Sequence, residues 1–220
     1  MSTRTLFIHI PKNAGTSIAA SCRVIPVSQK YMTDKMKSVE AMSAEKPFNI
    51  MRKHIPFSYL DRNKINLFDR RFAVVRNPWS RLVSLYNYGQ KISSSTAGTF
   101  YYQPEITWNE FFLRMDNFRM SSDYYWKHPY DQWATQLDWV SVGDKVKCDI
   151  LRYENIQDDL NSYFQYDVDL SKNNIGLYKI HYTEYYTEAQ KQKVADWFRL
   201  DIEHFGFTFE SGANRNYWTQ

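Results

Sequence analysis

The sequence contains little cysteine and no long hydrophobic run, and these absences exclude several classes of protein. Cys22 and Cys148 are its only cysteines, too few for a framework of disulfides or a cysteine-based metal cluster. No stretch approaches the roughly 20 apolar residues that span a bilayer, and no Asn-x-Ser/Thr glycosylation site occurs. The apolar run near the start, LFIHI, is too short for a signal peptide and is interrupted by His9. We therefore expect a cytoplasmic protein with no membrane span.

The charge of the chain is also low, which bears on the kind of partner it binds. The 28 Lys and Arg residues against 24 Asp and Glu residues leave a formal net charge of +4, and the basic residues are scattered along the chain. This pattern disfavours a nucleic-acid partner and suits an anionic small molecule or a glycan at least as well. A chain of 220 residues with 43% hydrophobic content predicts one globular domain over residues 1–220.

Hydrophobic patterning predicts alternating strands and helices, and hence an α/β fold whose central, mostly parallel sheet has helices on both faces. The Ser/Thr/Gly-rich residues 90–105 are typical of a mobile loop. A capping box of Thr187 and Gln190 opens the last helix, and Gly206 ends it. The expected strands cover residues 5–10, 71–76 and 147–152. The expected helices cover residues 16–24, 108–118, 156–164 and 188–205, with another that begins at Asn77-Pro78.

The segment LFIHIPKNAGTSI (residues 6–18) is typical of an anion-binding loop between a buried strand and a helix. Such a loop presents backbone N–H groups and the positive end of the helix dipole to a ligand. Gly15 allows close approach of the backbone, Thr16 and Ser17 add hydroxyl groups, and Lys12 adds a positive charge. The usual nucleotide loop, GxxxxGK[ST], differs, because here the first glycine is missing and the lysine lies three residues before Gly15.

A second segment, FAVVRNPWSRLVSLYNY (residues 72–88), predicts a separate phosphate site. Arg76 ends a strand, Asn77-Pro78 begins a helix, and Ser84 lies on the same helical face as Arg81 and Tyr88. A guanidinium and a hydroxyl group near the start of a helix can together hold a phosphate.

The two segments together resemble the donor-binding motifs of sulfotransferases that use 3′-phosphoadenosine 5′-phosphosulfate (PAPS). The early lysine resembles their 5′-phosphosulfate loop, and Arg76 followed by Ser84 resembles their 3′-phosphate motif. The segment VRNPWSRLVSLY is similar to sequences of the glycan-modifying branch, which contains the chondroitin, dermatan, heparan and uronosyl sulfotransferases and bacterial relatives. Further similar segments are KHIPFSYL (53–60), DILRYENIQDDL (149–160) and residues 181–209.

The resemblance implies a P-loop-like three-layer fold and transfer of a sulfuryl group from PAPS to an acceptor hydroxyl, without a metal. The implied donor-binding residues are Lys12, Asn13, Ala14, Gly15, Thr16, Ser17, Arg76 and Ser84. Lys12 is the candidate for neutralising charge on the leaving phosphate. The resemblance implies that Ser84 helps to hold Lys12 as well as the 3′-phosphate.

His54, in the family-like segment, is the candidate base that takes the acceptor proton. Glu154 is a second candidate base, and His128 is a weaker candidate for a contact with donor or acceptor; His9 is expected to pack in the core. The acceptor is expected to be a carbohydrate, because aromatic residues between 100 and 139 suit sugar rings, although most of these rings are expected in the core.

Two other functions stay open at this point. One is a P-loop-type kinase, which the displaced lysine and the absence of a magnesium-binding aspartate after a strand disfavour. The other is a sulfotransferase-like glycan-binding module without turnover, which the presence of Lys12, Arg76 and Ser84 disfavours.

Overall fold

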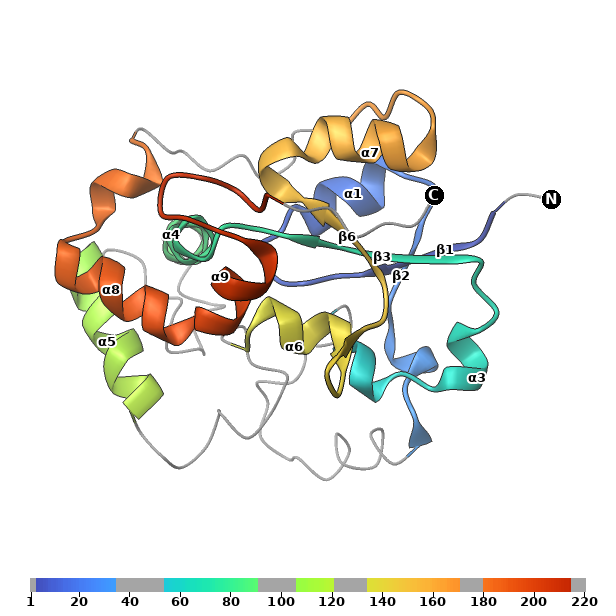
Figure 1. The fold of residues 1–220 in the computed structure, drawn as a ribbon, viewed down its shortest axis with the longest axis horizontal. Helices are drawn as coiled ribbons and strands as arrows, with labels where there is room; N and C mark the ends of the chain where they lie inside the picture. The colour runs from blue at the N-terminus through green and yellow to red at the C-terminus, as the bar shows by residue number, and fades with distance from the viewer. Residues whose placement is uncertain (1–2, 35–53, 91–105, 121–133, 171–179, 215–220) are drawn as a thin grey trace.

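The computed structural model describes residues 3–34, 54–90, 106–120, 134–170 and 180–214. Its centre is a sheet of four parallel strands in the order β2-β1-β3-β6 (Figure 1). The strands are β1 (Thr5–Ile8), β2 (Ile25–Pro26), β3 (Arg70–Val75) and β6 (Asp149–Arg152). In the register, Ile8 pairs with Ala73 and Ala73 pairs with Ile150. The parallel sheet predicted from the sequence is therefore confirmed.

Helices cover both faces of the sheet, as the patterning predicts. Helices α1 (Gly15–Ser21) and α7 (Ile156–Phe164) lie over one face, and α6 (Gln136–Val140) lies over the other (Figure 1). Alternate residues of the strands pack against the helices of the two opposite layers, because successive side chains of a strand point to opposite faces. Phe7 and Phe72 pack with Tyr163 of α7, whereas Ile8 and Ala73 belong to the larger cluster that contains Trp139.

The carboxyl ends of the strands meet at one edge of the sheet, and each is followed by a segment that turns back over it. The loop after β1 leads into α1, β3 leads into α4 (Pro78–Gly89), and β6 leads into the short helix η5 (Tyr153–Asn155). In open parallel sheets, ligands bind at this edge. The fold therefore brings the two predicted phosphate segments to the same edge.

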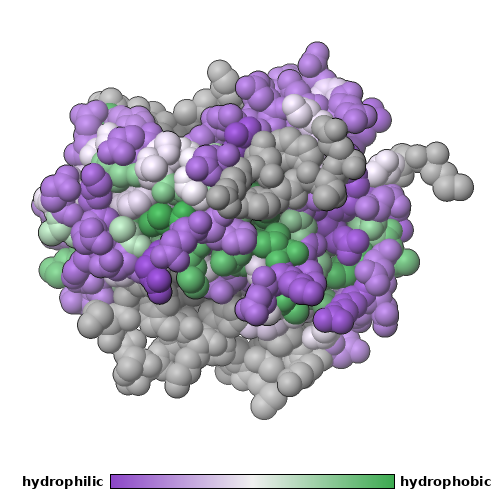
Figure 2. Space-filling view, viewed as in Figure 1, coloured by the Kyte–Doolittle hydropathy of each residue, from purple (hydrophilic) through white to green (hydrophobic). Residues whose placement is uncertain are grey.

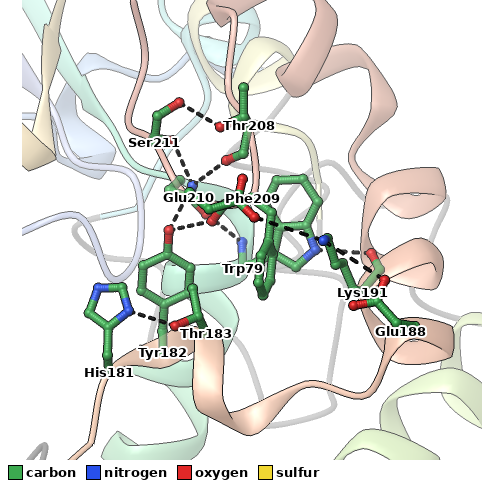
Figure 3. Close-up of polar contacts among 11 residues, drawn as sticks. Trp79, His181, Tyr182, Thr183, Glu188, Lys191, Thr208, Phe209, Glu210 and Ser211 are labelled. Atoms are coloured by element: carbon green, nitrogen blue, oxygen red, sulfur yellow. Dashed lines mark hydrogen bonds and ion pairs between the residues drawn. The ribbon is translucent and has the colours of Figure 1, made fainter.

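Asn77 begins α4 and also holds the end of the described chain. Its side-chain oxygen accepts hydrogen bonds from the backbone N–H groups of Trp79 (3.0 Å) and Ser80 (3.2 Å), so the predicted cap is confirmed. Its amide nitrogen donates to the carbonyl oxygens of Thr208 (2.9 Å) and Ser211 (2.8 Å). Figure 3 shows this region, where Tyr182 points toward the same turn. The start of α4 is thus tied to a segment more than 130 residues later.

The last predicted helix is wrong in one respect, because the structure divides it in two. Helix α8 (Glu188–Trp197) ends at Phe198, whose backbone (φ −116°, ψ 28°) departs from helical geometry, and α9 (Arg199–Phe205) follows. The buried side chain of Phe198 packs in the core at this break. The capping box of Thr187 and Gln190 and the stop at Gly206, with φ of 71°, are confirmed.

The remaining elements connect or flank these layers. The first predicted helix is shorter than expected and ends at Ser21, and the predicted loop at 90–105 lies almost wholly outside the described residues. The other elements are η1 (Gln29–Tyr31), η3 (Phe57–Tyr59), α3 (Arg62–Ile65), α5 (Trp108–Met120), β4 (Ser141–Val142), β5 (Lys145–Val146) and η6 (Tyr182–Tyr185).

The described surface is mainly hydrophilic on the face that Figure 2 presents, with separate hydrophobic patches across its middle. The most exposed large hydrophobic side chains come from different parts of the chain, and such isolated residues are normal for a protein surface. They are Leu67, Leu113, Tyr166, Ile180 and Leu200, with Tyr88 close to them in exposure. Among the described helices, none combines the length and the apolar character that crossing a bilayer requires.

Candidate active site

The loop after β1 has an unusual backbone that two buried arginines hold in place. Lys12 (φ 68°) and Ala14 (φ 61°) both adopt the left-handed conformation, which is uncommon for residues with a side chain and concentrates at functional sites. The Arg81 guanidinium donates to the carbonyl oxygen of Pro11 (3.2 Å), and the Arg76 guanidinium donates to that of Lys12 (3.0 Å). Because C=O and N–H of one peptide unit point in opposite directions, the N–H groups of Lys12 and Asn13 point away from these arginines.

Gly15 is required at the start of α1, because the ring of His9 occupies the space beside it. A Cβ atom at this position would lie 1.8 Å from Nε2 of His9. The His9 side chain is buried and stacks on Phe7, with ring centroids 5.5 Å apart. His9 therefore packs in the interior as the sequence predicts, but it also forms one wall of the loop.

His54 lies directly beside this wall. Its Nδ1 atom is 2.9 Å from the carbonyl oxygen of His9, and the two imidazole rings are 4.2 Å apart at their centroids. A carbonyl oxygen can only accept a hydrogen bond, so Nδ1 of His54 carries the hydrogen, and in the neutral ring the lone pair is on Nε2. A histidine held in this tautomer can take up a proton at Nε2.

Arg76 joins the two predicted phosphate segments, and it uses a serine that the sequence did not single out. Besides its bond to the carbonyl of Lys12, the guanidinium donates from Nε (3.0 Å) and Nη2 (2.8 Å) to the hydroxyl oxygen of Ser80. The guanidinium carbon also lies 3.9 Å from the centre of the Tyr153 ring. Ser84, predicted as the partner of Arg76, is buried one helical turn beyond Ser80. Ser80 and Tyr153 were missed because neither has a distinctive spacing.

The ammonium group of Lys12 lies over the aromatic ring of Tyr88, a residue of α4. Its Nζ atom is 3.6 Å from the centre of the Tyr88 ring, which is the geometry of a cation–π contact. Ser80, Ser84 and Tyr88 are spaced four residues apart on α4, so they share one face of that helix. Arg76 contacts one end of this face and Lys12 the other, which places Ser84 between the two cations.

The structure thus brings Lys12, Arg76, Ser84 and His54 to one edge of the sheet. At the start of α1, Ser17 is buried and Thr16 is exposed. The carboxylate of Glu154, the second candidate base, accepts a hydrogen bond from the backbone N–H of Asn77 (2.7 Å).

Among the aromatic residues between 100 and 139 that the structure describes, Phe111, Phe112 and Trp139 are buried in the core. His128 lies outside the described residues.

Two buried polar residues beneath the loop, Gln136 and Asp201, were not apparent from the sequence. Asn13 donates from Nδ2 to the carbonyl oxygen of Val74 (2.7 Å) and to Oε1 of Gln136 (2.7 Å). Gln136 is in turn held by Asp201 of α9, whose carboxylate accepts from the backbone N–H groups of Gln136 (2.8 Å) and Leu137 (2.9 Å). Burial raises the pKa of Asp201 to about 6, against the effect of these hydrogen bonds and of Arg81.

A parallel sheet with a strand–loop–helix unit after its first strand and an arginine at the end of the neighbouring strand defines a P-loop-like α/β fold. The sequence profile of the sulfotransferase family matches residues 2–208, and the chain belongs to this family. The family predicted from the two motifs is therefore confirmed, and with it sulfotransferase activity in general. No protein with a curated description matches the chain closely enough for a comparison.

The raised pKa of Asp201 predicts that this carboxyl makes folding depend on pH. Because its pKa rises from the ordinary 3.8 to about 6 on folding, its contribution to stability is fully present below 3.8 and is lost as the pH rises through 6. The free energy of unfolding of the wild type, minus that of Asp201→Asn, should therefore increase as the pH falls from 7 to 4, by up to about 3 kcal/mol.

Urea denaturation at several pH values measures this difference. Asp144→Asn, at an exposed position between β4 and β5, is the matched control and should follow the wild-type profile. Parallel profiles for the wild type and Asp201→Asn would contradict the prediction.

Proposed function

We propose that the protein transfers a sulfuryl group from PAPS to a hydroxyl group of a carbohydrate acceptor and releases 3′,5′-ADP. The observation that carries this proposal is the hydrogen bond from the Arg76 guanidinium to the carbonyl oxygen of Lys12 (3.0 Å). It joins a loop suited to a 5′-phosphosulfate to a cation suited to a second phosphate. PAPS differs from ATP in having its second phosphate group on the ribose, and the two-part site matches that difference.

The residues present fit the donor at both of its charged ends. Lys12 and the backbone N–H groups of residues 13–17 would hold the 5′ end, where the left-handed residues Lys12 and Ala14 give the concave backbone typical of anion sites. Arg76, Ser80 and Ser84 would hold the 3′-phosphate. Arg76 already has an ordered guanidinium, because Ser80 and the Tyr153 ring fix its plane. The donor supplies the sulfuryl group and a good leaving phosphate.

The reaction exchanges one S–O bond for another, and the protein supplies a base and positive charge. The acceptor oxygen forms a bond to sulfur while the bond from sulfur to the leaving phosphate oxygen breaks, and both electrons of that bond stay with the phosphate. Lys12 stabilises the charge that develops there. The proton of the acceptor hydroxyl passes to Nε2 of His54, since Nδ1 is engaged with the carbonyl of His9.

A carbohydrate acceptor is supported mainly by the similarity of VRNPWSRLVSLY to the glycan-modifying branch. A transfer assay with sulfur-labelled PAPS and a panel of glycans, with tyrosine peptides and small phenols as other acceptors, tests the class directly. Label should appear in a glycan fraction. Label confined to a peptide or a phenol would overturn the carbohydrate assignment, and tighter binding of ATP with Mg²⁺ than of 3′,5′-ADP would favour the kinase alternative.

His54→Ala should abolish transfer and leave donor binding nearly intact, because the imidazole acts on the acceptor proton only. Loss of a general base typically lowers the rate by about 10²–10⁴-fold. Initial rates with labelled PAPS and calorimetric titration with 3′,5′-ADP measure the two effects. His181→Ala is the control, since His181 is exposed and its ring contacts Thr183 of η6. Turnover by His54→Ala near the wild-type rate would remove His54 from this role.

Arg76→Ala should weaken 3′,5′-ADP more strongly than ADP, because the guanidinium is assigned to the 3′-phosphate, whereas loss of its bond to the carbonyl oxygen of Lys12 affects both nucleotides. Loss of a charge-assisted contact predicts a decrease in affinity of roughly 10- to 100-fold for 3′,5′-ADP and much less for ADP. Arg76→Lys keeps the charge but not the planar donor pair, so it should restore only part of the affinity. Arg199→Ala, on the exposed side of α9, should change neither. An equal loss for ADP and 3′,5′-ADP would contradict the assignment.

A further inference from the structure

The side-chain amide of Gln136 is fully buried, and each of its hydrogen-bonding positions is used. Its Oε1 atom accepts from Nδ2 of Asn13 (2.7 Å) and from the backbone N–H of Arg76 (2.8 Å). Its Nε2 atom donates to the carbonyl oxygen of Arg76 (2.8 Å) and to the carboxylate of Asp201 (3.2 Å). A primary amide has two acceptor lone pairs and two N–H donors, so this side chain is saturated and its orientation is fixed.

The backbone of Gln136, at the start of α6, is also held by hydrogen bonds. Asp201, which is also fully buried, accepts hydrogen bonds from the backbone N–H groups of Gln136 and Leu137. The capping box of Thr135 and Asp138 closes the same first turn of α6. Gln136 therefore projects from a rigid point on one layer of the fold to the edge of the sheet.

The amide of Gln136 lies beyond the point where backbone hydrogen bonds pair β1 with β3. The pairing of β1 with β3 ends at Ile8 and Ala73, whereas Asn13 and Arg76 lie beyond it. Past this point side chains hold the two segments together. Asn13 bonds to the carbonyl of Val74, the guanidinium of Arg76 bonds to that of Lys12, and Gln136 contacts Asn13 and both backbone groups of Arg76.

We propose that Gln136 is a positioning residue that sets the distance between the two phosphate-binding segments, so that one nucleotide engages both. This inference rests on the function proposed above. A nucleotide that is anchored at one phosphate gains from the second contact only if the second group already lies within reach. Gln136 itself touches neither phosphate; it acts through Asn13 on the loop and through the backbone of Arg76 on the other segment.

The gain from the second phosphate is the ratio of the affinity for 3′,5′-ADP to the affinity for 5′-AMP. Titration calorimetry measures both affinities. Gln136→Met conserves the volume of the side chain but removes all four hydrogen bonds. We expect the ratio to decrease by about tenfold, which corresponds to the net free energy of one or two hydrogen bonds. Gln136→Asn, which keeps the amide on a shorter stem, is a milder second variant and should lower the ratio in the same direction.

Tyr163→Phe is the matched control. It removes a hydrogen bond from a buried side chain, that of the Tyr163 hydroxyl to Asp149 (2.7 Å), on the opposite face of the sheet. It should lower stability without changing the ratio.

The outcomes separate the two proposals. A lower ratio in both Gln136 variants, with the control unchanged, supports the positioning role. An unchanged ratio, even with both affinities reduced, means that Gln136 is only a buried structural amide and overturns the inference. If wild-type protein binds 3′,5′-ADP no better than 5′-AMP, the proposed donor site itself fails, and the inference fails with it.

Discussion

The parallel pairing of β1 with β3 is the constraint on which the site depends. It aligns Ile8 with Ala73, so that the segments that follow these residues leave the sheet at the same edge. Two residues far apart in the sequence, Lys12 and Arg76, thereby come within hydrogen-bonding distance. A parallel pair requires a long connection between its strands, and here that connection carries His54 as well. One register therefore brings two cations and a histidine together.

The charges of the site are stabilised by an arrangement that also shapes the backbone. Arg76 and Arg81 are both buried, and a buried cation requires partners. Part of that requirement is met by the carbonyl oxygens of Lys12 and Pro11, which turn toward the guanidinium groups. The same rotation directs the neighbouring N–H groups to the other side of the loop. The hydrogen bonds to the arginines and the direction of the neighbouring N–H groups are thus two results of one loop conformation.

Much of this arrangement could be predicted from the sequence because local signals encode it. The strand before Lys12, the cap at Asn77 and the stop at Gly206 each depend on a few adjacent residues, and the structure confirms all three. The bonds of Gln136 and Asp201 could not be predicted, since they join residues 60 or more positions apart and neither residue belongs to a motif. Family resemblance supplied the candidate site residues, but the contacts among them depend on tertiary packing.

The contact between Gly15 and His9 has an evolutionary consequence. The backbone of α1 approaches the imidazole as closely as a hydrogen atom permits, and no side chain fits between them. The two positions are therefore sterically coupled: a residue with a Cβ atom at 15 is compatible only with a smaller or displaced side chain at 9. Because the backbone carbonyl of position 9 also orients His54, a change at either position would also affect the imidazole ring of His54. Among descendants of this sequence, a substitution at 15 is therefore expected only together with, or after, one at 9.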